Sequence, residues 1–390
     1  MAFAGIWLLI CLLYSFRLSG LILYSGIDVL SLVENLLIVF IFGALLSYLL
    51  PISLTMPVSW SLPDNERTEE LLSRRLNLWF RVWCSLTLLE ILYSGGVPSV
   101  WLITGNPKTY MDFGIPTIHG FMNSMLLAIC LSRLGMAIRF GRKKDLIYPF
   151  WAVFWSLIVI TRQLMMVFLL EVVVIYCTYR PVRIKRIASA ALSLFCLVYL
   201  FGVVGDLRTG AAAFLALAQP TSSYPEWLPS GFLWFYMYLC TPVNNLLYTF
   251  HTTPPLYDWR FPSTLSQLLP TVFRKMIFSA AELGNVNGDL VTEAFNVSTA
   301  FAGPFQDFGL SGVLSMSFFM SVLSGIFWRK RTFRDRLCYA VLCQCLLLTV
   351  FFNHFVLLPV ITQLVWIYVF FYRTEGDILP SQKTASKVGI

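Results

Sequence analysis

Long runs of apolar residues alternate with short polar segments along most of the chain. A helix needs about 20 mostly apolar residues to cross the hydrocarbon core of a bilayer, where it satisfies its own backbone polar groups. We therefore expect about ten membrane-spanning helices, an even number that places both termini on one side. The expected spans are residues 3–16, 30–50, 77–94, 115–138, 147–161, 163–179, 187–204, 308–328, 337–352 and 355–372.

Composition strengthens this interpretation. Charged residues make up 12% of the 390 residues, against about 25% in soluble proteins. Hydrophobic residues make up 58% and the mean hydropathy is +0.74, so the apolar side chains cannot all be buried in a water-facing globule of this size. A soluble enzyme, a disordered chain and a nucleic-acid binder are excluded. The sequence predicts an all-α polytopic membrane protein that forms a single integral membrane domain over residues 1–390.

The placement of basic residues predicts the orientation. Of the 28 lysines and arginines, twenty-one fall on one side of the expected bundle and seven on the other. Basic residues concentrate in cytoplasmic loops, so the first side, which holds both termini, is predicted to be cytoplasmic. This bias also explains the net charge of +8 without a nucleic-acid partner.

One large segment, residues 205–307, is expected outside the membrane on the opposite face. Residues 231–250 within it are apolar enough to resemble a span, but a proline and two asparagines interrupt them. Counting them as a crossing would move the basic cluster that begins at Arg329 to the outer side. We therefore predict a re-entrant or interfacial helix at about 231–250.

Two arginines on the outer side stand out. Arg162 lies in a short hairpin between two apolar stretches, and Arg208 follows the seventh span directly. A guanidinium binds phosphate through two parallel hydrogen bonds, so both suit a lipid-linked diphosphate whose headgroup lies at this level. Alternatively, Arg162 is a snorkelling side chain at a helix end, and Arg208 forms an ion pair with Asp206. Glu171, in the middle of a span, needs a polar partner or a proton.

A base that takes the proton of a sugar hydroxyl could be His119, His354 or an outer carboxylate, although a lone histidine more often has a structural role. No residue spacing suggests a metal site, because the three histidines are scattered and no Asp-x-Asp pair occurs. No cofactor is expected. The candidate catalytic residues are Arg162, Arg208, His119 and His354, and the candidate substrate-binding residues are Arg274, Lys275, Asp206, Asn245 and Arg260.

The outer segment is also rich in aromatic residues. Among them are Tyr224, Trp227, Trp234, Tyr236, Tyr238, Tyr248, Tyr257 and Trp259. An aromatic belt at the membrane interface accounts for most of them. The alternative is that some stack against sugar faces along a glycan groove.

Five short motifs, taken together and in this order, resemble the Wzy-type O-antigen (oligosaccharide repeat unit) polymerases. They are Phe113 to Gly120 opening a span, the Thr161-Arg162-Gln163 hairpin, Arg208 beyond the seventh span, Pro242 to Asn245 after an aromatic helix, and Asp307 to Gly312 entering a late span. The resemblance covers most of the chain.

The resemblance implies an enzyme of the bacterial inner membrane with a metal-independent, lipid-using (GT-C-like) glycosyltransferase fold. Its donor and acceptor would be undecaprenyl diphosphate-linked oligosaccharides, and a chain-length regulator protein would be a further partner besides the lipid bilayer. The growing glycan would pass to a new repeat unit on the periplasmic face. Essential periplasmic arginines of the family correspond to Arg162 and Arg208 here.

Three alternatives remain open from the sequence. An O-antigen ligase would share the helical bundle and the large outer segment. A lipid-linked oligosaccharide flippase would more often carry charges along a central cavity and show two similar halves, and a small-solute permease is disfavoured on the same ground.

Overall fold

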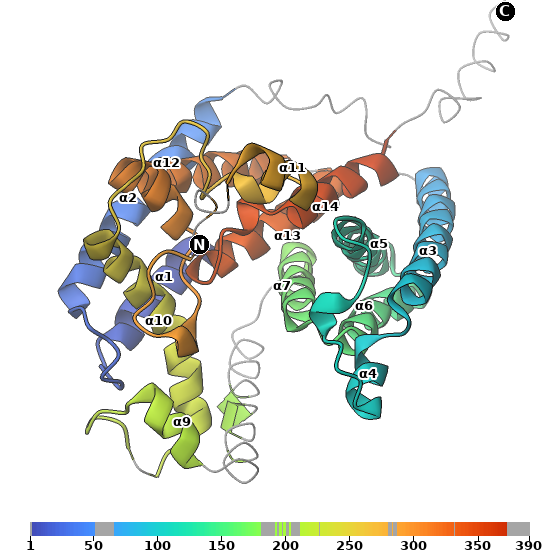
Figure 1. The fold of residues 1–390 in the computed structure, drawn as a ribbon. Helices are drawn as coiled ribbons and strands as arrows, with labels where there is room; N and C mark the ends of the chain where they lie inside the picture. Colours follow the sequence, from blue (N-terminus) through green and yellow to red (C-terminus); the bar gives the residue numbers. More distant parts are fainter. Residues whose placement is uncertain are drawn as a thin grey trace, which may run out of the picture. The chain divides into compact units, whose positions relative to one another are not determined.

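In the computed structural model, described residues are 2–50, 66–180, 211–225, 227–279, 287–330 and 332–372, with Leu283 and a few positions between 192 and 203. These residues form helices joined by loops, and no strand occurs among them (Figure 1). The longer helices are α1 (Ala2–Tyr14), α2 (Gly26–Leu49), α3 (Glu66–Ser94), α4 (Pro98–Thr104), α5 (Ile118–Phe140), α6 (Ile147–Ile158), α7 (Arg162–Tyr179), α9 (Ala211–Ala218), α10 (Ser230–Thr252), α11 (Thr271–Ile277), α12 (Ala302–Arg329), α13 (Phe333–Leu347) and α14 (Leu358–Phe370). Short 3-10 turns are η3 (Tyr110–Asp112), η4 (Lys143–Leu146), η5 (Ser266–Leu268), η6 (Glu293–Phe295), η7 (Leu348–Val350) and η8 (His354–Val356).

Five helical stretches within the described residues are long and apolar enough to cross a membrane: Gly26–Leu49, Glu69–Thr104, Ile118–Phe140, Arg162–Tyr179 and Ala302–Arg329. Two further apolar helices, α1 and α14, are shorter. This set is compatible with a membrane protein, and the all-helical architecture is confirmed for the described residues. The expected helix at 187–204 lies almost entirely outside them, and the number of crossings stays a prediction.

Helix α3 begins at Glu66, well before the expected start at residue 77. The added turns are polar, and the carboxylate of Glu70 lies 2.8 Å from the guanidinium of Arg74 one turn later. Such pairs four residues apart support a helix. The apolar pattern therefore predicted the start of this helix too late, because charged residues form its first turns.

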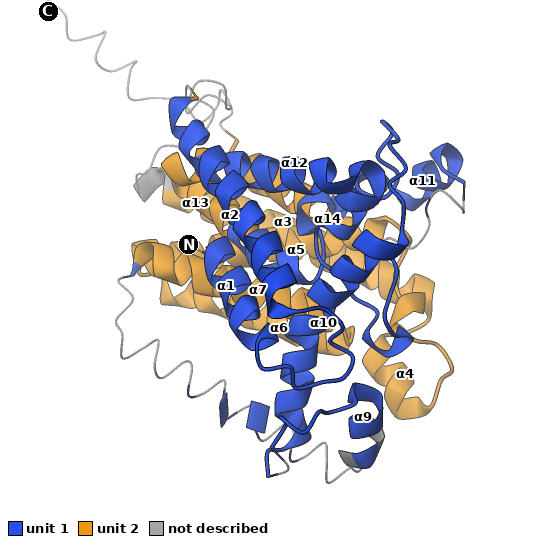
Figure 2. Ribbon diagram, turned by 90° about the vertical axis from the view of Figure 1, so that its left-hand side faces the viewer, with its two compact units in different colours: residues 1–49, 180–325, 342–358 blue, residues 50–179, 326–341, 359–390 orange. Residues whose placement is uncertain are grey.

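The chain divides into two compact units (Figure 2), each built from separate parts of the sequence. Unit 1 comprises residues 1–49, 180–325 and 342–358, and unit 2 comprises residues 50–179, 326–341 and 359–390.

In unit 1, α10 packs against α1 and α9. It is continuous from Ser230 to Thr252 and includes Pro242, so a helix occupies the segment in which one is expected at about 231–250. The two asparagines are buried and bonded rather than disruptive. Asn244 accepts hydrogen bonds from the Tyr14 hydroxyl and the Leu23 amide, both at 2.9 Å. The re-entrant or interfacial position expected for α10 stays a prediction.

In unit 2, α5 is the central helix and packs against α3, α6 and α7. Its one buried cation, Arg133, lies 2.8 Å from the buried carboxylate of Asp145 and also donates to Ser73 and Asn77. A charge in an apolar helix is costly unless it is paired in this way. The cluster therefore joins α3, α5 and η4.

Side-chain hydrogen bonds join α14 to α5 and α7 in unit 2. Thr362 donates to the hydroxyl of Ser124 at 2.9 Å. The Gln363 amide donates to both carboxylate oxygens of Glu171, each at 2.9 Å. Glu171 therefore has the polar partner that its position in the apolar helix α7 requires.

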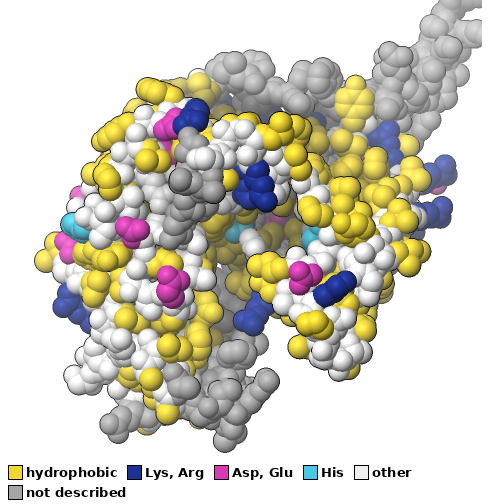
Figure 3. All heavy atoms as spheres, in the orientation of Figure 1, with side chains coloured by type: hydrophobic (Ala, Val, Ile, Leu, Met, Phe, Trp, Pro, Cys, Tyr) yellow, Lys and Arg dark blue, Asp and Glu magenta, His cyan; other side chains and the backbone are white. Residues whose placement is uncertain are grey.

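Hydrophobic side chains cover much of the face shown in Figure 3, with charged side chains scattered among them. On α2, large apolar residues are exposed along the helix, including Ile38, Ile41, Phe42, Leu45 and Leu49. Soluble monomers rarely expose apolar stretches of this kind, whereas the surface of a membrane helix does.

Candidate functional site

His119 lies in the first turn of α5, where its imidazole Nδ1 is 3.1 Å from a carboxylate oxygen of Glu90. The Glu90 side chain, near the end of α3, is 1% exposed, whereas that of His119 is 25% exposed. The carboxylate is therefore shielded from water while the imidazole is accessible. A paired carboxylate and imidazole are the elements of a general base.

Hydrogen bonding assigns the tautomer of His119. The indole N–H of Trp155, which can only donate, lies 3.3 Å from Asn123 Oδ1. The amide nitrogen of Asn123 therefore faces His119 Nε2, at 2.9 Å. Nε2 accepts this hydrogen bond, and Nδ1 carries the proton that points to Glu90.

The segment that leads into α5 is fixed to the end of α3. Glu90 Oε1 accepts the N–H of Ile115 at 3.2 Å, and the Ser94 hydroxyl accepts that of Gly114 at 2.9 Å. Gly114 has a φ of +91°, and a Cβ there would lie 2.7 Å from Cγ of His119. Glycine is therefore required both for this backbone conformation and for the close approach of the ring.

Arg162 is the first residue of α7, and its side chain is exposed and has no partner among the described residues. Helices α5, α6 and α7 pack side by side in succession (Figure 1), so the first turns of α5 and α7 lie at the same end of unit 2. His119 and Arg162 are brought to that end together. The free N–H groups at the start of α7 add to the attraction for an anion.

His354 begins η8 in unit 1 and is 4% exposed. Its Nδ1 faces the side-chain amide nitrogen of Gln344 at 3.3 Å. Burial lowers the pKa of His354 to about 4, because removal from water disfavours the charged form. Its ring is therefore neutral at pH 7 and is largely covered by protein.

The side-chain amide of Asn245 forms hydrogen bonds to the protein backbone within unit 1. Its Nδ2 donates to the carbonyls of Phe295 and Val297, both at 2.9 Å, and its Oδ1 accepts the N–H of Val291 at 3.1 Å. It therefore holds the segment that includes η6 against α10. Its assignment to substrate binding stays a prediction.

Asp307 anchors a second loop of unit 1. Its buried carboxylate accepts the backbone N–H groups of Ser263 at 3.0 Å and Thr264 at 2.8 Å. Directly after it, Phe308 and Gly309 leave the helical conformation, and Gly309 has a φ of 61° and a ψ of −148°. The motif therefore bends α12 and fixes the loop at its bend.

The remaining basic candidates of unit 1 differ in their surroundings. Arg260 donates to the carboxylate of Asp258 at 2.7 Å, and this contact lowers the pKa of Asp258. Arg274 and Lys275 lie on the short helix α11, where Lys275 is exposed. The Nε of Arg274 is buried and has no hydrogen-bond partner among the described residues.

The structure places His119 and Arg162 at the same end of unit 2, and it places His354, Asn245, Arg260, Arg274 and Lys275 in unit 1. Arg208 and Asp206 lie outside the described residues. Within the described part of the chain, no group of three or more His, Cys, Asp and Glu residues could hold a metal ion.

Sequence reasoning missed three contributors: Glu90 and Asn123 as partners of His119, and Asp307 as a loop anchor. Glu90 carried a usable signal, because a carboxylate near the end of an apolar helix needs a polar partner.

Comparison with protein-family models, curated proteins and solved structures gives no match for this chain in any of the three.

Proposed function

We propose that this chain is a glycosyltransferase of the Wzy-type O-antigen polymerase class in a bacterial inner membrane. It joins lipid-linked oligosaccharide repeat units on the periplasmic face and releases undecaprenyl diphosphate. The bundle has ten crossings, both termini are cytoplasmic, residues 205–307 form the periplasmic segment, and the architecture is of the GT-C type. The observation that carries the proposal is the Glu90–His119 pair at the same end of unit 2 as Arg162, which has no partner among the described residues.

In the proposed mechanism, the hydroxyl oxygen of the acceptor sugar attacks the anomeric carbon of the donor glycan. The bond from that carbon to the diphosphate oxygen breaks, and undecaprenyl diphosphate leaves with the electron pair. His119 Nε2 takes the hydroxyl proton once the acceptor displaces the amide of Asn123. Glu90 then stabilises the resulting imidazolium, as a buried carboxylate does for a catalytic histidine.

The arginines act on the leaving group. A diphosphate that leaves accumulates negative charge, and fixed guanidinium groups stabilise that charge without a metal ion. Arg162 is suited to this role because no side chain among the described residues occupies its guanidinium. Arg208, which lies outside the described residues, has the same proposed role on the grounds of its chemistry alone.

The test is deletion of the gene in its native host, followed by gel analysis of the lipopolysaccharide. A polymerase predicts a core that carries a single repeat unit. A bare core would instead indicate an O-antigen ligase or a flippase, and the polymerase assignment would be wrong. Complementation with the Arg162→Ala variant should fail to restore long chains at unchanged protein level.

A further inference from the structure

Four large apolar side chains are exposed on the short helix α11, at the edge of unit 1 (Figure 2). They are Val272, Phe273, Met276 and Ile277, and Met276 is 77% exposed. Helix α11 has seven residues and is about 10 Å long, so it is too short to cross a bilayer. Surfaces that face water rarely expose so many large apolar side chains together. The exposed side of α11 therefore needs an apolar partner.

An exposed tryptophan lies on the loop before α11. Trp259 is 81% exposed, and its two neighbours in the chain, Asp258 and Arg260, form an ion pair with each other. The guanidinium of Arg260 also lies over the ring of Phe278, 5.9 Å from its centroid. Phe278 directly follows α11. The loop that carries Trp259 and the end of α11 are therefore neighbours within unit 1.

This loop is fixed against the bend of α12. The centroids of the Trp259 and Phe308 rings are 5.0 Å apart. The N–H of Leu256 also donates to the carbonyl of Gln306 at 2.7 Å. Phe308 lies at the bend and is the first residue of the span expected at 308–328. These contacts therefore hold Trp259 at the level where α12 is expected to enter the membrane.

The charges beside the exposed apolar side chains match an anionic membrane surface. Residues 262–279 contain two basic residues, Arg274 and Lys275, and no acidic residue. Lys275 is exposed, and both basic residues lie in the last turn of α11. Exposed apolar side chains beside lysine and arginine are typical of helices that lie in the membrane interface, where the basic groups attract anionic lipids. Tryptophan is enriched at the same level.

We infer that Trp259 and the exposed side of α11 insert into the headgroup region of the membrane, where Arg274 and Lys275 contact the phosphates of anionic phospholipids. The partner of these two basic residues is the lipid of the bilayer, whereas the sequence suggested a role in substrate binding. The contact fixes the loop before α11 at the membrane surface beside the bend of α12. It requires a membrane and does not require the proposed glycosyl transfer.

Site-specific photo-cross-linking of the full-length chain tests this contact. The chain is placed in nanodiscs of phosphatidylcholine with a minority of phosphatidylglycerol, and no lipid-linked oligosaccharide is added. The photoreactive residue p-benzoylphenylalanine replaces Phe273 or Met276, and mass spectrometry identifies what it attaches to after irradiation. Ile41, exposed on the apolar helix α2, is the positive control. Glu293, exposed on η6, is the control within residues 205–307.

Phospholipid should be attached at positions 273 and 276, as at position 41, and far less should be attached at position 293. Phosphatidylglycerol should be enriched among the adducts at position 276 by at least about twofold over its share of the nanodisc. Lys275→Glu should abolish this enrichment without lowering the unfolding midpoint, because the side chain of Lys275 is exposed. If Lys275→Glu does not accumulate as folded protein, Lys275→Gln takes its place and should reduce the enrichment.

Three results would overturn the inference. The first is the absence of phospholipid at positions 273 and 276 when position 41 gives adducts, or equal yields at positions 273 and 293. The second is attachment to another copy of the chain, which would make this surface a protein interface. The third is equal enrichment of phosphatidylglycerol in wild type and in the Lys275 variant. A chain that lacks polymerase activity would leave all of these measurements unchanged, so the inference and the proposed function can fail separately.

Discussion

The imidazole of His119 lies between two side chains that fix its orientation, with Nδ1 3.1 Å from Glu90 and Nε2 2.9 Å from Asn123. Its partners come from α3 and from the next turn of α5, and Trp155 of α6 orients the Asn123 amide. This geometry places the unprotonated nitrogen on the side away from the carboxylate. The proposed general base therefore depends on the carboxylate of Glu90 as well as on the imidazole of His119.

Replacement of His119 or Glu90 tests this dependence. His119→Ala should reduce the polymerisation rate by about 10²- to 10⁴-fold. Glu90→Gln should also reduce the rate, because the imidazolium that forms loses its counter-charge. The measurement is the rate of repeat-unit addition in isolated membranes, normalised to protein level. Wild-type rates for both variants would contradict the assignment of His119 as the base.

Replacement of Arg162 should change the length of the glycan product without changing the stability of the protein. Its side chain is exposed and has no partner among the described residues, so Arg162→Ala should change the free energy of unfolding by no more than about 0.5 kcal/mol. It should nevertheless abolish long-chain product on lipopolysaccharide gels. The matched control is Arg74→Ala, an exposed arginine paired with Glu70, which should leave the chain-length pattern intact. Loss of long glycan chains in the Arg74→Ala control as well would show that the effect is not specific to Arg162.

Asp307 should matter for stability. Asp307→Ala leaves the amides of Ser263 and Thr264 buried without an acceptor, which should lower the free energy of unfolding by roughly 2–3 kcal/mol. Thermal unfolding in detergent micelles measures the effect, with Asp258→Ala as a control because Asp258 bonds on an exposed loop. A smaller loss for Asp307→Ala than for Asp258→Ala would show that the loop is held by other contacts.

His354 should make stability sensitive to mild acid. Its pKa is about 4 in the folded chain and about 6.5 when unfolded, so the unfolded chain binds the extra proton between these values. The stability that depends on the uncharged ring of His354 is therefore fully present above pH 6.5. It is lost as the pH falls toward 4, at roughly 1 kcal/mol per pH unit.

Unfolding midpoints measured from pH 7.5 to pH 4.5 check this prediction. His354→Gln, which keeps a polar side chain but does not titrate, should show a flatter dependence over that range. An equal slope in both proteins would assign the acid sensitivity to other groups.

Much of the helical architecture could be predicted from apolar runs, because a run long enough to span a membrane has few other stable structures. Exceptions have physical causes. The start of α3 was missed because ion pairs rather than apolar residues extend it. A helix at about 231–250 was expected, but the continuity of α10 through Pro242 depends partly on neighbouring segments that satisfy the asparagines after it, and the sequence does not show these contacts.

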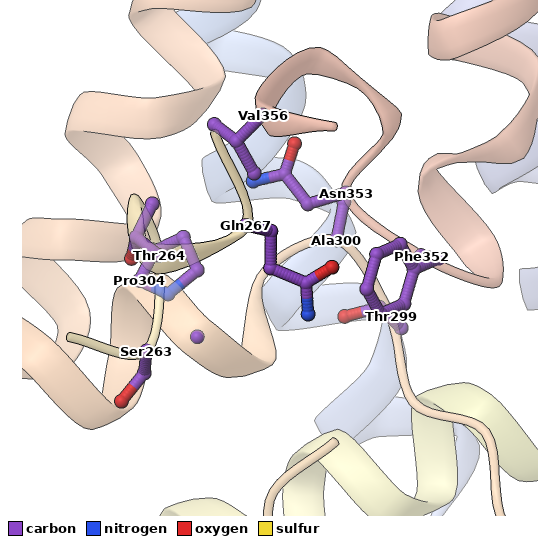
Figure 4. Close-up of a pocket in the computed structure, with 10 residues that line it drawn as sticks. Ser263, Thr264, Gln267, Thr299, Ala300, Pro304, Phe352, Asn353 and Val356 are labelled. Carbon is purple, nitrogen blue, oxygen red and sulfur yellow. The ribbon is translucent and has the colours of Figure 1, made fainter. Parts of the chain in front are cut away.

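The candidate site was less predictable. The sequence indicated His119 and Arg162 as outer polar residues, but their neighbours depend on how helices pack. Glu90 is 29 residues from His119 in the chain and meets it only because α3 lies against α5. The pocket that Thr264, Thr299 and Asn353 line (Figure 4) is formed by three segments that are separate in the sequence, and local sequence carries no signal for such an assembly.

The most direct test of the central claim uses the full-length chain in liposomes with a purified undecaprenyl diphosphate-linked repeat unit as the only substrate. The proposal predicts a ladder of lipid-linked oligomers together with released undecaprenyl diphosphate, and no ladder from the Arg162→Ala variant. A wild-type chain that yields only unreacted repeat units under these conditions would contradict the assignment as a polymerase.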